Sequence, residues 1–322
     1  MRRLMAVAIM TALAATGATF QADFTKLGEC RLEARGAGRA VVNDGALQLD
    51  EVPASLVVVG AGAVGVEWAS LFSTLGSEVT VVEMLDRLVP NEDAEISELL
   101  RKSFVASGIG VKIGTAVGEI TGSPGVMRVE ISANGGAVET LECATVLNAT
   151  GRRPNTRELG LEAAGVTTER GAIPVDEGMR TNVANIYAIG DVTGRAMLAH
   201  VASHQGVVAA ENIAGGSEQM DYNAIPAATF CHPEIASVGL TEEQATAEHG
   251  GALVGRFSYM ASGRARSYGD TEGMLKVIAE PKYQAVVGMH IIGAAGAGKT
   301  CRIAKRAAGA ELFGWLSFIA FG

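Results

Sequence analysis

The pattern of hydrophobic and polar residues is clearest between residues 55 and 83, where it predicts a strand, a helix and a second strand. Residues 56–59 form a mostly β-branched apolar run, typical of a buried strand, and residues 78–82 predict another. Between them apolar residues recur at the period of a helix, which we expect to stop at Gly76. Its expected buried face consists of Val64, Trp68, Leu71, Phe72 and Leu75.

The turn between the first strand and the helix has the spacing Gly-x-Gly-x-x-Gly, at Gly60, Gly62 and Gly65. In such a turn the first glycine permits a tight bend, the second lets the backbone approach a pyrophosphate, and the third lets the helix pack close to the strand. The helix N-terminus presents N–H groups to the phosphates. Glu83 ends the second strand, where a carboxylate accepts hydrogen bonds from an adenosine ribose. This favours NAD, although Arg87 leaves NADP open.

Further patterns predict more elements along the chain. A helix is expected over residues 91–107, ending at Gly108, and a hairpin turn at Asn134-Gly135. A short buried strand over residues 186–189 leads to Gly190-Asp191, and a helix follows over residues 197–213. Further strands are predicted at 111–113, 127–131, 137–141 and 144–149, and an antiparallel sheet at 235–238, 256–260, 274–278 and 284–292.

Composition narrows the class of protein. The 322 residues suffice for two or three domains, and 48% apolar with 19% charged residues favours folded cores. The net charge of −9 argues against binding nucleic acid or an anionic membrane. The four cysteines, Cys30, Cys143, Cys231 and Cys301, are scattered without metal-ligand spacing, so we expect no metal site and a reducing compartment.

The N-terminal sequence is compatible with more than one cellular location of the protein. Arg2 and Arg3 precede an apolar run, the layout of a targeting segment, while the chemistry downstream fits the cytoplasm. We therefore expect a cytoplasmic protein, or one in an organelle matrix or secreted if residues 1–20 are a targeting segment. No internal stretch predicts a membrane span.

Taken in order, these segments resemble the class I pyridine nucleotide-disulfide oxidoreductase family, and most of all its dihydrolipoamide dehydrogenases. The resemblance runs from about residue 41 to residue 293 and includes the Gly60–Glu83 unit, NATGRRPNT, YAIGDV, MLAH, HPEIASVGL and GMHIIG. It implies an α/β fold. A Rossmann-like NAD-binding domain would span residues 41–151, a central FAD-contacting segment 152–220, and a partial α+β dimerisation domain 221–300. Residues 1–40 and 301–322 stay unassigned.

The resemblance also implies the cofactors NAD and FAD and the residues that bind them. The pyrophosphate and nicotinamide of NAD would lie along residues 60–67, the ribose at Glu83 and the adenine by Val117. Gly151 would contact the cofactor through its backbone, and the flavin would contact Asp191 and residues 197–200. The full set is Gly60, Ala61, Gly62, Ala63, Val64, Gly65, Val66, Glu67, Glu83, Val117, Gly151, Asp191, Met197, Leu198, Ala199 and His200.

Three parts of the family's machinery are not found in this sequence. They are an N-terminal FAD-binding glycine turn, a pair of redox cysteines four residues apart, and a C-terminal His–Glu pair. We therefore assign no catalytic residue and expect a truncated chain. Its family activity would be oxidation of a dihydrolipoamide-type substrate by NAD through FAD. The alternatives are an NAD-binding module, a non-catalytic fragment, or a relative of glutathione or mercuric reductase. The family forms homodimers, which the incomplete last domain makes doubtful here.

Overall fold

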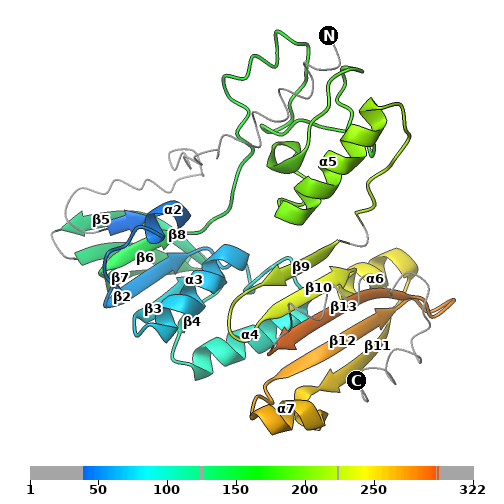
Figure 1. The fold of residues 1–322 in the computed structure, drawn as a ribbon. Helices are drawn as coiled ribbons and strands as arrows, with labels where there is room; N and C mark the ends of the chain where they lie inside the picture. The colour runs from blue at the N-terminus through cyan, green and yellow to red at the C-terminus, as the bar shows by residue number, and fades with distance from the viewer. Residues whose placement is uncertain (1–38, 124–125, 223–224, 295, 297–322) are drawn as a thin grey trace. The chain divides into compact units, whose positions relative to one another are not determined.

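The computed structural model describes residues 39–123, 126–222, 225–294 and 296, which fall into two compact units (Figure 1). The larger unit contains residues 39–151 and 226–296, and the smaller contains Arg152–Ile225. The expectations for a targeting segment over residues 1–20 and for the tail 301–322 lie outside the described residues. None of the helices in the described ranges has the length and apolar character that a membrane span requires.

A parallel sheet of five strands forms the first half of the larger unit, in the order β1-β8-β2-β3-β4. Its strands are β1 (Arg39–Val41), β2 (Ser55–Val59), β3 (Glu78–Val82), β4 (Gly110–Lys112) and β8 (Thr145–Asn148). Its helices are α2 (Asn43–Ala46), α3 (Ala63–Thr74) and α4 (Ala94–Ala106). The alternation of strands and helices from β2 to β4 confirms the predicted Rossmann-like arrangement.

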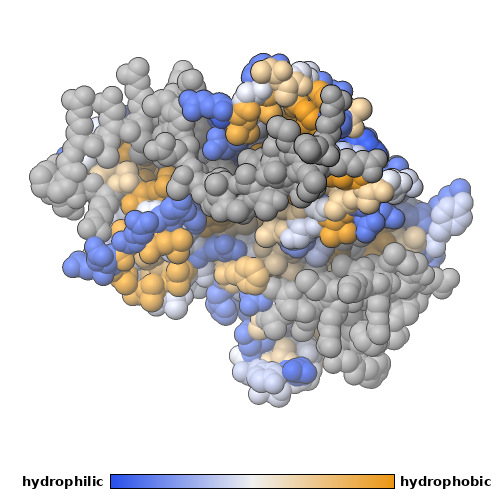
Figure 2. Space-filling model, turned by 45° about the horizontal axis from the view of Figure 1, so that its top comes forward, coloured by the Kyte–Doolittle hydropathy of each residue, from blue (hydrophilic) through white to orange (hydrophobic). Residues whose placement is uncertain are grey.

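The buried face of α3 differs from the predicted one. Gly65, Val66 and Ala69 are buried together with Phe72, whereas Leu71 and Leu75 are exposed. Small residues face the sheet because they let the helix axis approach the strands closely. The larger leucines therefore fall on the outer side, among the exposed hydrophobic residues of the molecule. Figure 2 shows in orange the hydrophobic residues on one face of the surface.

Three antiparallel strands lie between β4 and β8 in the sequence: β5 (Thr115–Ser123), β6 (Val126–Ala133) and β7 (Val138–Cys143). The predicted hairpin turn joins β6 to β7, and both Asn134 and Gly135 have the positive φ that such a turn requires. The pattern gave no signal for β5, whose pairing with β6 shifts register between Val117 and Ile120. An irregular strand does not show clean alternation.

The second half of the larger unit is an antiparallel sheet, as predicted, in the order β11-β12-β13-β10-β9. Its elements are β9 (Pro226–Thr229), β10 (Ile235–Gly239), α6 (Glu242–His249), β11 (Leu253–Ser258), the 3₁₀ helix η3 (Tyr259–Ala261), α7 (Gly263–Tyr268), β12 (Gly273–Ala279) and β13 (Val286–Gly293). Helix α4 lies between this sheet and the parallel one (Figure 1). Its Phe104 shares one apolar core with Ile235 and Ile292.

The smaller unit has little regular structure. It contains the 3₁₀ helix η2 (Gly190–Thr193) and helix α5 (Ala199–Ile213). The strand predicted over residues 186–189 is wrong, because Tyr187 forms only an isolated bridge with Arg180. Helix α5 begins two residues later than predicted, since the Leu198 N–H bonds to the Ala196 carbonyl in a tight turn and Leu198 caps the helix in an extended conformation.

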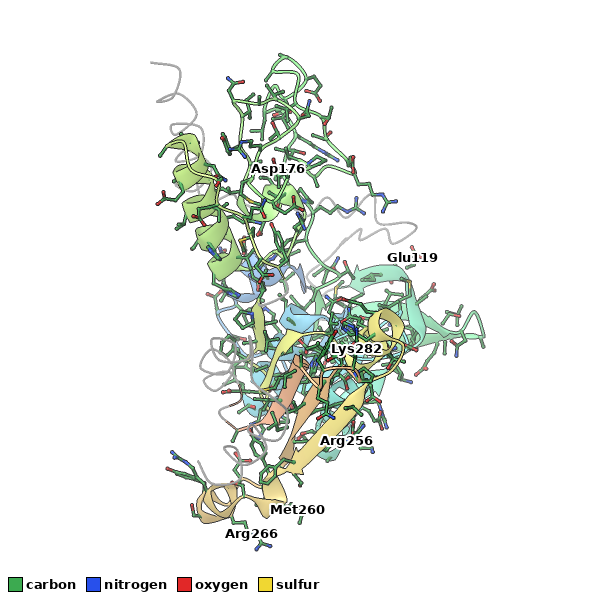
Figure 3. All side chains as sticks on the ribbon, turned by 90° about the vertical axis from the view of Figure 1, so that its right-hand side faces the viewer. Glu119, Asp176, Arg256, Met260, Arg266 and Lys282 are labelled. Atoms are coloured by element: carbon green, nitrogen blue, oxygen red, sulfur yellow. The ribbon has the colours of Figure 1, made fainter. Side chains whose placement is uncertain are left out.

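A buried ionic cluster joins α4 to the antiparallel sheet. The Lys276 ammonium group on β12 lies 2.7 Å from an Asp93 carboxylate oxygen and 2.7 Å from a Glu242 oxygen. Asp93 is the N-cap of α4, where its side chain accepts a hydrogen bond from the Glu95 N–H. Arg256 on β11 (Figure 3) extends the cluster by pairing with Glu95 at 2.8 Å. Lys276 and Asp93 are buried, so the attraction between them is weakly screened by solvent.

The environment of Asp93 fixes its charge. Burial alone would raise its pKa, but hydrogen bonds from Lys276 and from the Glu242 N–H, with the charge of Lys276, lower that pKa below its ordinary value. A depressed folded-state pKa stabilises the fold above the unfolded-state value, which is about 3.9. This contribution is lost as the pH falls through the lower, folded-state value.

We expect Lys276→Met to reduce the free energy of unfolding by about 3–5 kcal/mol at pH 8, because it leaves Asp93 buried without its cation. The loss should shrink towards pH 5, since Asp93 without Lys276 has a raised pKa and is neutralised by a proton. Urea denaturation at both pH values measures this. The control is Lys112→Met, which breaks the exposed pair with Glu139 and should cost less than about 1 kcal/mol. Equal losses in the two variants would contradict the prediction.

Candidate functional site

The loops after β2 and β8 lie side by side at the carboxyl edge of the parallel sheet. The two strands are paired in parallel, and the Ala149 N–H donates a hydrogen bond to the Val59 carbonyl at 2.7 Å. From β2 the chain continues through β3 to β4 on one side, while β8 lies on the other. Open α/β sheets bind ligands at such a change of strand order. The glycine turn at residues 60–65 is located there.

Two glycines of this turn exclude any side chain. Gly60 has a φ of +95°, and a Cβ on it would lie 2.7 Å from the Ala149 carbonyl oxygen. A Cβ on Gly65 would lie 2.0 Å from the Gly60 carbonyl oxygen, well inside van der Waals contact. The helix can therefore approach the turn this closely only with glycine at residue 65.

Gly62 has the opposite environment. Its backbone has an ordinary φ of −67°, and a Cβ built on it would meet no atom within 4 Å. Gly62 is also the N-cap of α3, and its carbonyl accepts the first helical hydrogen bond, from the Val66 N–H. The N–H groups of Ala63, Val64 and Gly65 precede that bond, so the helix presents them, with its positive dipole end, to the space beside Gly62. This arrangement suits a phosphate group.

Glu83 follows β3 and lies against the glycine turn. One oxygen of its buried carboxylate accepts a hydrogen bond from the Ala61 N–H at 2.7 Å, and the other accepts from the Leu85 N–H at 2.8 Å. A carboxylate has about four acceptor positions, so two hydrogen bonds leave capacity for a ligand. Glu83 thus ties the turn to the end of β3 and places negative charge beside it.

Other residues near the turn make contacts within the larger unit. Arg87 pairs with Asp86 and with Glu243 of α6, each at 3.3 Å. The carboxylate of Glu67 on α3 accepts a hydrogen bond from the Phe230 N–H at 2.8 Å. The contacts with Glu243 and with Phe230 direct Arg87 and Glu67 towards the second half of the unit.

The remaining predicted site residues of the larger unit lie on its strands and in its turns. Ala61 and Val66 are fully buried, and their N–H groups bond to the Glu83 carboxylate and to the Gly62 carbonyl, while Ala63 is exposed. Val117 lies on β5, in the segment where register shifts. Gly151 follows β8 with a φ of +115° and has open space where a side chain would be. The structure thus brings the glycine turn and Glu83 together.

The smaller unit contains the other predicted group. Asp191 lies in η2, and one of its carboxylate oxygens is 4.0 Å from the Arg152 guanidinium. Met197 and Leu198 are half-buried before α5, and Ala199 and His200 are exposed in its first turn. The sequence did not single out Gln205, a buried residue of α5 whose side chain accepts a hydrogen bond from the Gly190 N–H at 2.7 Å. Its only sequence signal is a polar residue within an apolar helical stripe.

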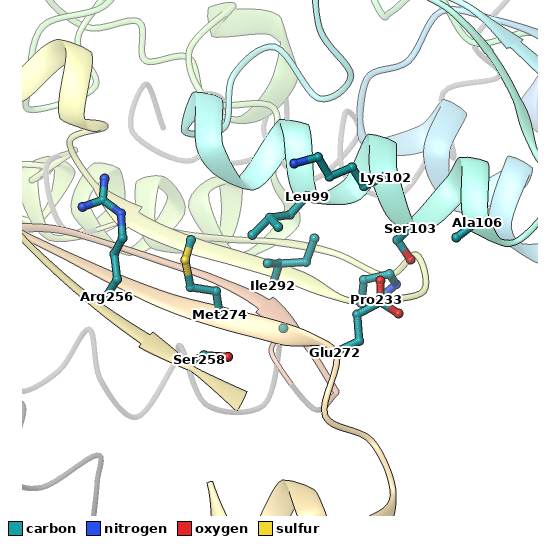
Figure 4. A pocket seen from close by; sticks show the side chains of 11 residues that line it. Leu99, Lys102, Ser103, Ala106, Pro233, Arg256, Ser258, Glu272, Met274 and Ile292 are labelled. Carbon is teal, nitrogen blue, oxygen red and sulfur yellow. The ribbon is translucent and has the colours of Figure 1, made fainter. Parts of the chain in front are cut away.

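A separate pocket of about 510 Å³ lies between α4 and the antiparallel sheet, where Leu99 and Lys102 face Met274 and Ile292 (Figure 4). None of the predicted site residues lines it. In the described part of the chain, no group of three or more His, Cys, Asp or Glu residues is arranged to hold a metal ion.

Comparison with known proteins places this geometry in a family. Residues 6–206 match the family model "Pyridine nucleotide-disulphide oxidoreductase", and residues 225–311 match that family's dimerisation domain. Among curated proteins, dihydrolipoyl dehydrogenase of Chlamydia pneumoniae is 42% identical over 258 residues, which are 80% of this chain and 55% of that protein. The enzyme of the same name from Mycobacterium leprae is 45% identical over 246 residues, 76% of this chain and 52% of that protein.

Solved structures of similar fold come from the same family of enzymes. LpdA from Mycobacterium tuberculosis superposes with a TM-score of 0.77 at 28% identity, covering 86% of this chain and 62% of that one. The flavoprotein disulfide reductase RclA from Escherichia coli superposes with a TM-score of 0.75 at 29% identity, and the match covers 84% of this chain and 62% of RclA. The chain spans about half the length of the curated relatives it matches. From its sequence match and its fold, the chain belongs to the pyridine nucleotide-disulfide oxidoreductase family.

Proposed function

We propose that this chain binds NAD and FAD as part of a flavin disulfide oxidoreductase of the dihydrolipoyl dehydrogenase type. The observation that carries the proposal is the glycine turn with open space at Gly62, beside the carboxylate of Glu83. A pyrophosphate fits that space, and the helix N-terminus favours its charge. Glu83 would accept hydrogen bonds from the adenosine ribose. Because a 2′-phosphate would meet this negative charge, and Arg87 is paired with Glu243, NAD is favoured over NADP.

The smaller unit would contribute to flavin binding. Asp191 offers a partly exposed carboxylate to the hydroxyl groups of the ribityl chain, and the N-terminal turn of α5, which begins at Ala199, offers its positive dipole end. Bound FAD would exchange two electrons with the nicotinamide. We assign the NAD-binding domain to residues 41–151, the flavin-contacting segment to 152–220 and the dimerisation domain to 221–300.

The dithiol step is where this chain differs from the proposed family reaction. Cys143 and Cys231 are free and buried. Burial raises the pKa of the Cys143 thiol to about 11 and that of Cys231 to about 12. A thiol with so high a pKa carries almost no thiolate near neutral pH and is a poor nucleophile. We propose that neither cysteine exchanges with a dihydrolipoamide-type substrate, and that electrons instead pass between NADH and flavin.

A second candidate is an NAD-binding module without flavin chemistry. One observation supports this second candidate. The glycine turn and Glu83 together resemble a complete dinucleotide-binding arrangement, whereas the proposed flavin residues form only part of a site. In either case we propose a cytoplasmic protein. We also propose that the chain forms a homodimer through residues 221–300, because residues 225–311 match the family's dimerisation domain.

The experiment that separates the two candidates is an absorbance spectrum of the full chain with added FAD, followed by NADH. The lead proposal expects a bound flavin band that NADH bleaches, and NADH-dependent reduction of an artificial dye. NADH binding without any flavin band would favour the NAD-binding module. Absence of binding by both cofactors would contradict both candidates.

We expect Gly62→Ala to weaken NAD binding by at least about tenfold, or about 1.4 kcal/mol, because the new methyl group enters the space of the pyrophosphate. Stability should change little, since the backbone of Gly62 suits alanine. Isothermal titration measures the affinity. The matched control is Gly263→Ala in α7, where a Cβ also meets no atom within 4 Å. Equal NAD affinity in the two variants would refute the pyrophosphate assignment.

We also expect the two buried thiols to react slowly. In a variant with Cys30→Ser and Cys301→Ser, an aromatic disulfide reagent at pH 8 should label the folded chain about a hundredfold more slowly than the chain in denaturant. The physical reason is the raised pKa of both remaining thiols. Labelling of the folded variant at the rate of an exposed thiol would argue against this assignment.

A further inference from the structure

Gln205 is a fully buried amide in the middle of α5. Its neighbours along the same helical stripe, Val201, Val208 and Ala209, are also buried and belong to one apolar core. A primary amide in such surroundings is costly unless both its oxygen and its nitrogen are hydrogen-bonded. The partners of the Gln205 side chain therefore show what it holds in place.

Both partners lie outside α5. The Gly190 N–H donates to the Gln205 oxygen at 2.7 Å, and the Gln205 amide nitrogen donates to the Tyr222 hydroxyl at 2.8 Å. The Arg195 guanidinium lies 4.0 Å from the centre of the Tyr222 ring. Gln205 thus connects helix α5 with the turn before Asp191 and with a ring that contacts the segment after it.

The turn itself is held from both sides of Gly190. Its N–H group bonds to Gln205, and its carbonyl oxygen accepts a hydrogen bond from the Thr193 hydroxyl at 2.8 Å. Gly190 has a φ of +76°, so the turn depends on a conformation that few side chains allow. Asp191 is the next residue, and its carboxylate is set by this peptide.

We propose that Gln205 is a positioning residue for flavin binding, which fixes the Asp191 carboxylate relative to the N-terminal turn of α5. The inference rests on the proposed function, in which Asp191 and residues 197–200 contact FAD. One side chain anchored on the helix sets the separation between the helix terminus and the acid. A ligand that needs both groups together would be sensitive to the loss of that anchor.

Three substitutions in the full chain test the inference by FAD titration. Gln205→Met removes both hydrogen bonds at similar volume and should weaken FAD binding by about tenfold. Gln205→Glu keeps an acceptor for the Gly190 N–H, while the Tyr222 hydroxyl can turn to donate, so FAD affinity should return to within about threefold of wild type. The control is Asn212→Leu, since Asn212 is a buried amide on the same helix that bonds to Gly178 and Glu218 instead.

NAD affinity should stay unchanged in all three variants, because the glycine turn belongs to the other unit. The inference is overturned if Asn212→Leu weakens FAD binding as much as Gln205→Met, or if Gln205→Met leaves it unchanged. Either result would mean that Gln205 only supports the helix.

Hydrogen–deuterium exchange without flavin separates this inference from the proposed function. Gln205→Met should accelerate exchange of the Gly190 amide, whereas Asn212→Leu and Gln205→Glu should leave it close to wild type. If wild type fails to bind FAD, the flavin proposal fails, and the exchange result alone decides whether Gln205 fixes the turn. Unchanged exchange at Gly190 in Gln205→Met would overturn the inference.

Discussion

The Lys276 ammonium group lies among the carboxylates of Asp93, Glu95 and Glu242, which come from the start of α4 and the start of α6. The single carboxylate of Asp93 accepts three hydrogen bonds, from the Lys276 ammonium group, from the Glu95 N–H and from the Glu242 N–H. Asp93 thus caps α4, accepts a hydrogen bond from the first residue of α6 and neutralises a buried cation. This geometry and the apolar core that both halves share set the relative position of the two halves of the larger unit, because a displaced Asp93 would leave several polar groups unpaired.

The two candidate ligand regions are built in a similar way. Each presents the N-terminal turn of a helix, α3 or α5, and one carboxylate, Glu83 or Asp191. In each region a hydrogen bond to the backbone of a turn holds the parts together, from Ala61 in one and from Gly190 in the other. Binding through backbone groups, as we propose for both regions, would explain why several predicted site residues are small and apolar. Small side chains at these positions would let a ligand come close to the backbone.

The sequence predicted those elements whose signals are local. The β2 strand, the glycine turn and β3 follow from a run of apolar residues and three glycines, and the β6–β7 hairpin follows from Asn134-Gly135. The outer position of Leu71 was not predictable, because the close approach of Gly65 to Gly60 decides which face of α3 meets the sheet. Residues 186–189 have the composition of a strand, but a strand also needs a neighbour with which to pair. The role of Gln205 depends on Gly190 and Tyr222, which helical periodicity does not reveal.

The larger unit is discontinuous in sequence, because Arg152–Ile225 belongs to the other unit. Asp93 and Lys276 are 183 residues apart. At a synthesis rate of about 5–20 residues per second, Lys276 leaves the ribosome roughly 10–40 s after Asp93. During that interval the nascent parallel sheet has an acid without its cation and an α4 surface without the antiparallel sheet that buries it. The stretch from Arg152 to Ile225 is complete earlier. The larger unit therefore cannot be completed before Lys276 is made, and until then its first half exposes the α4 surface that the antiparallel sheet later buries.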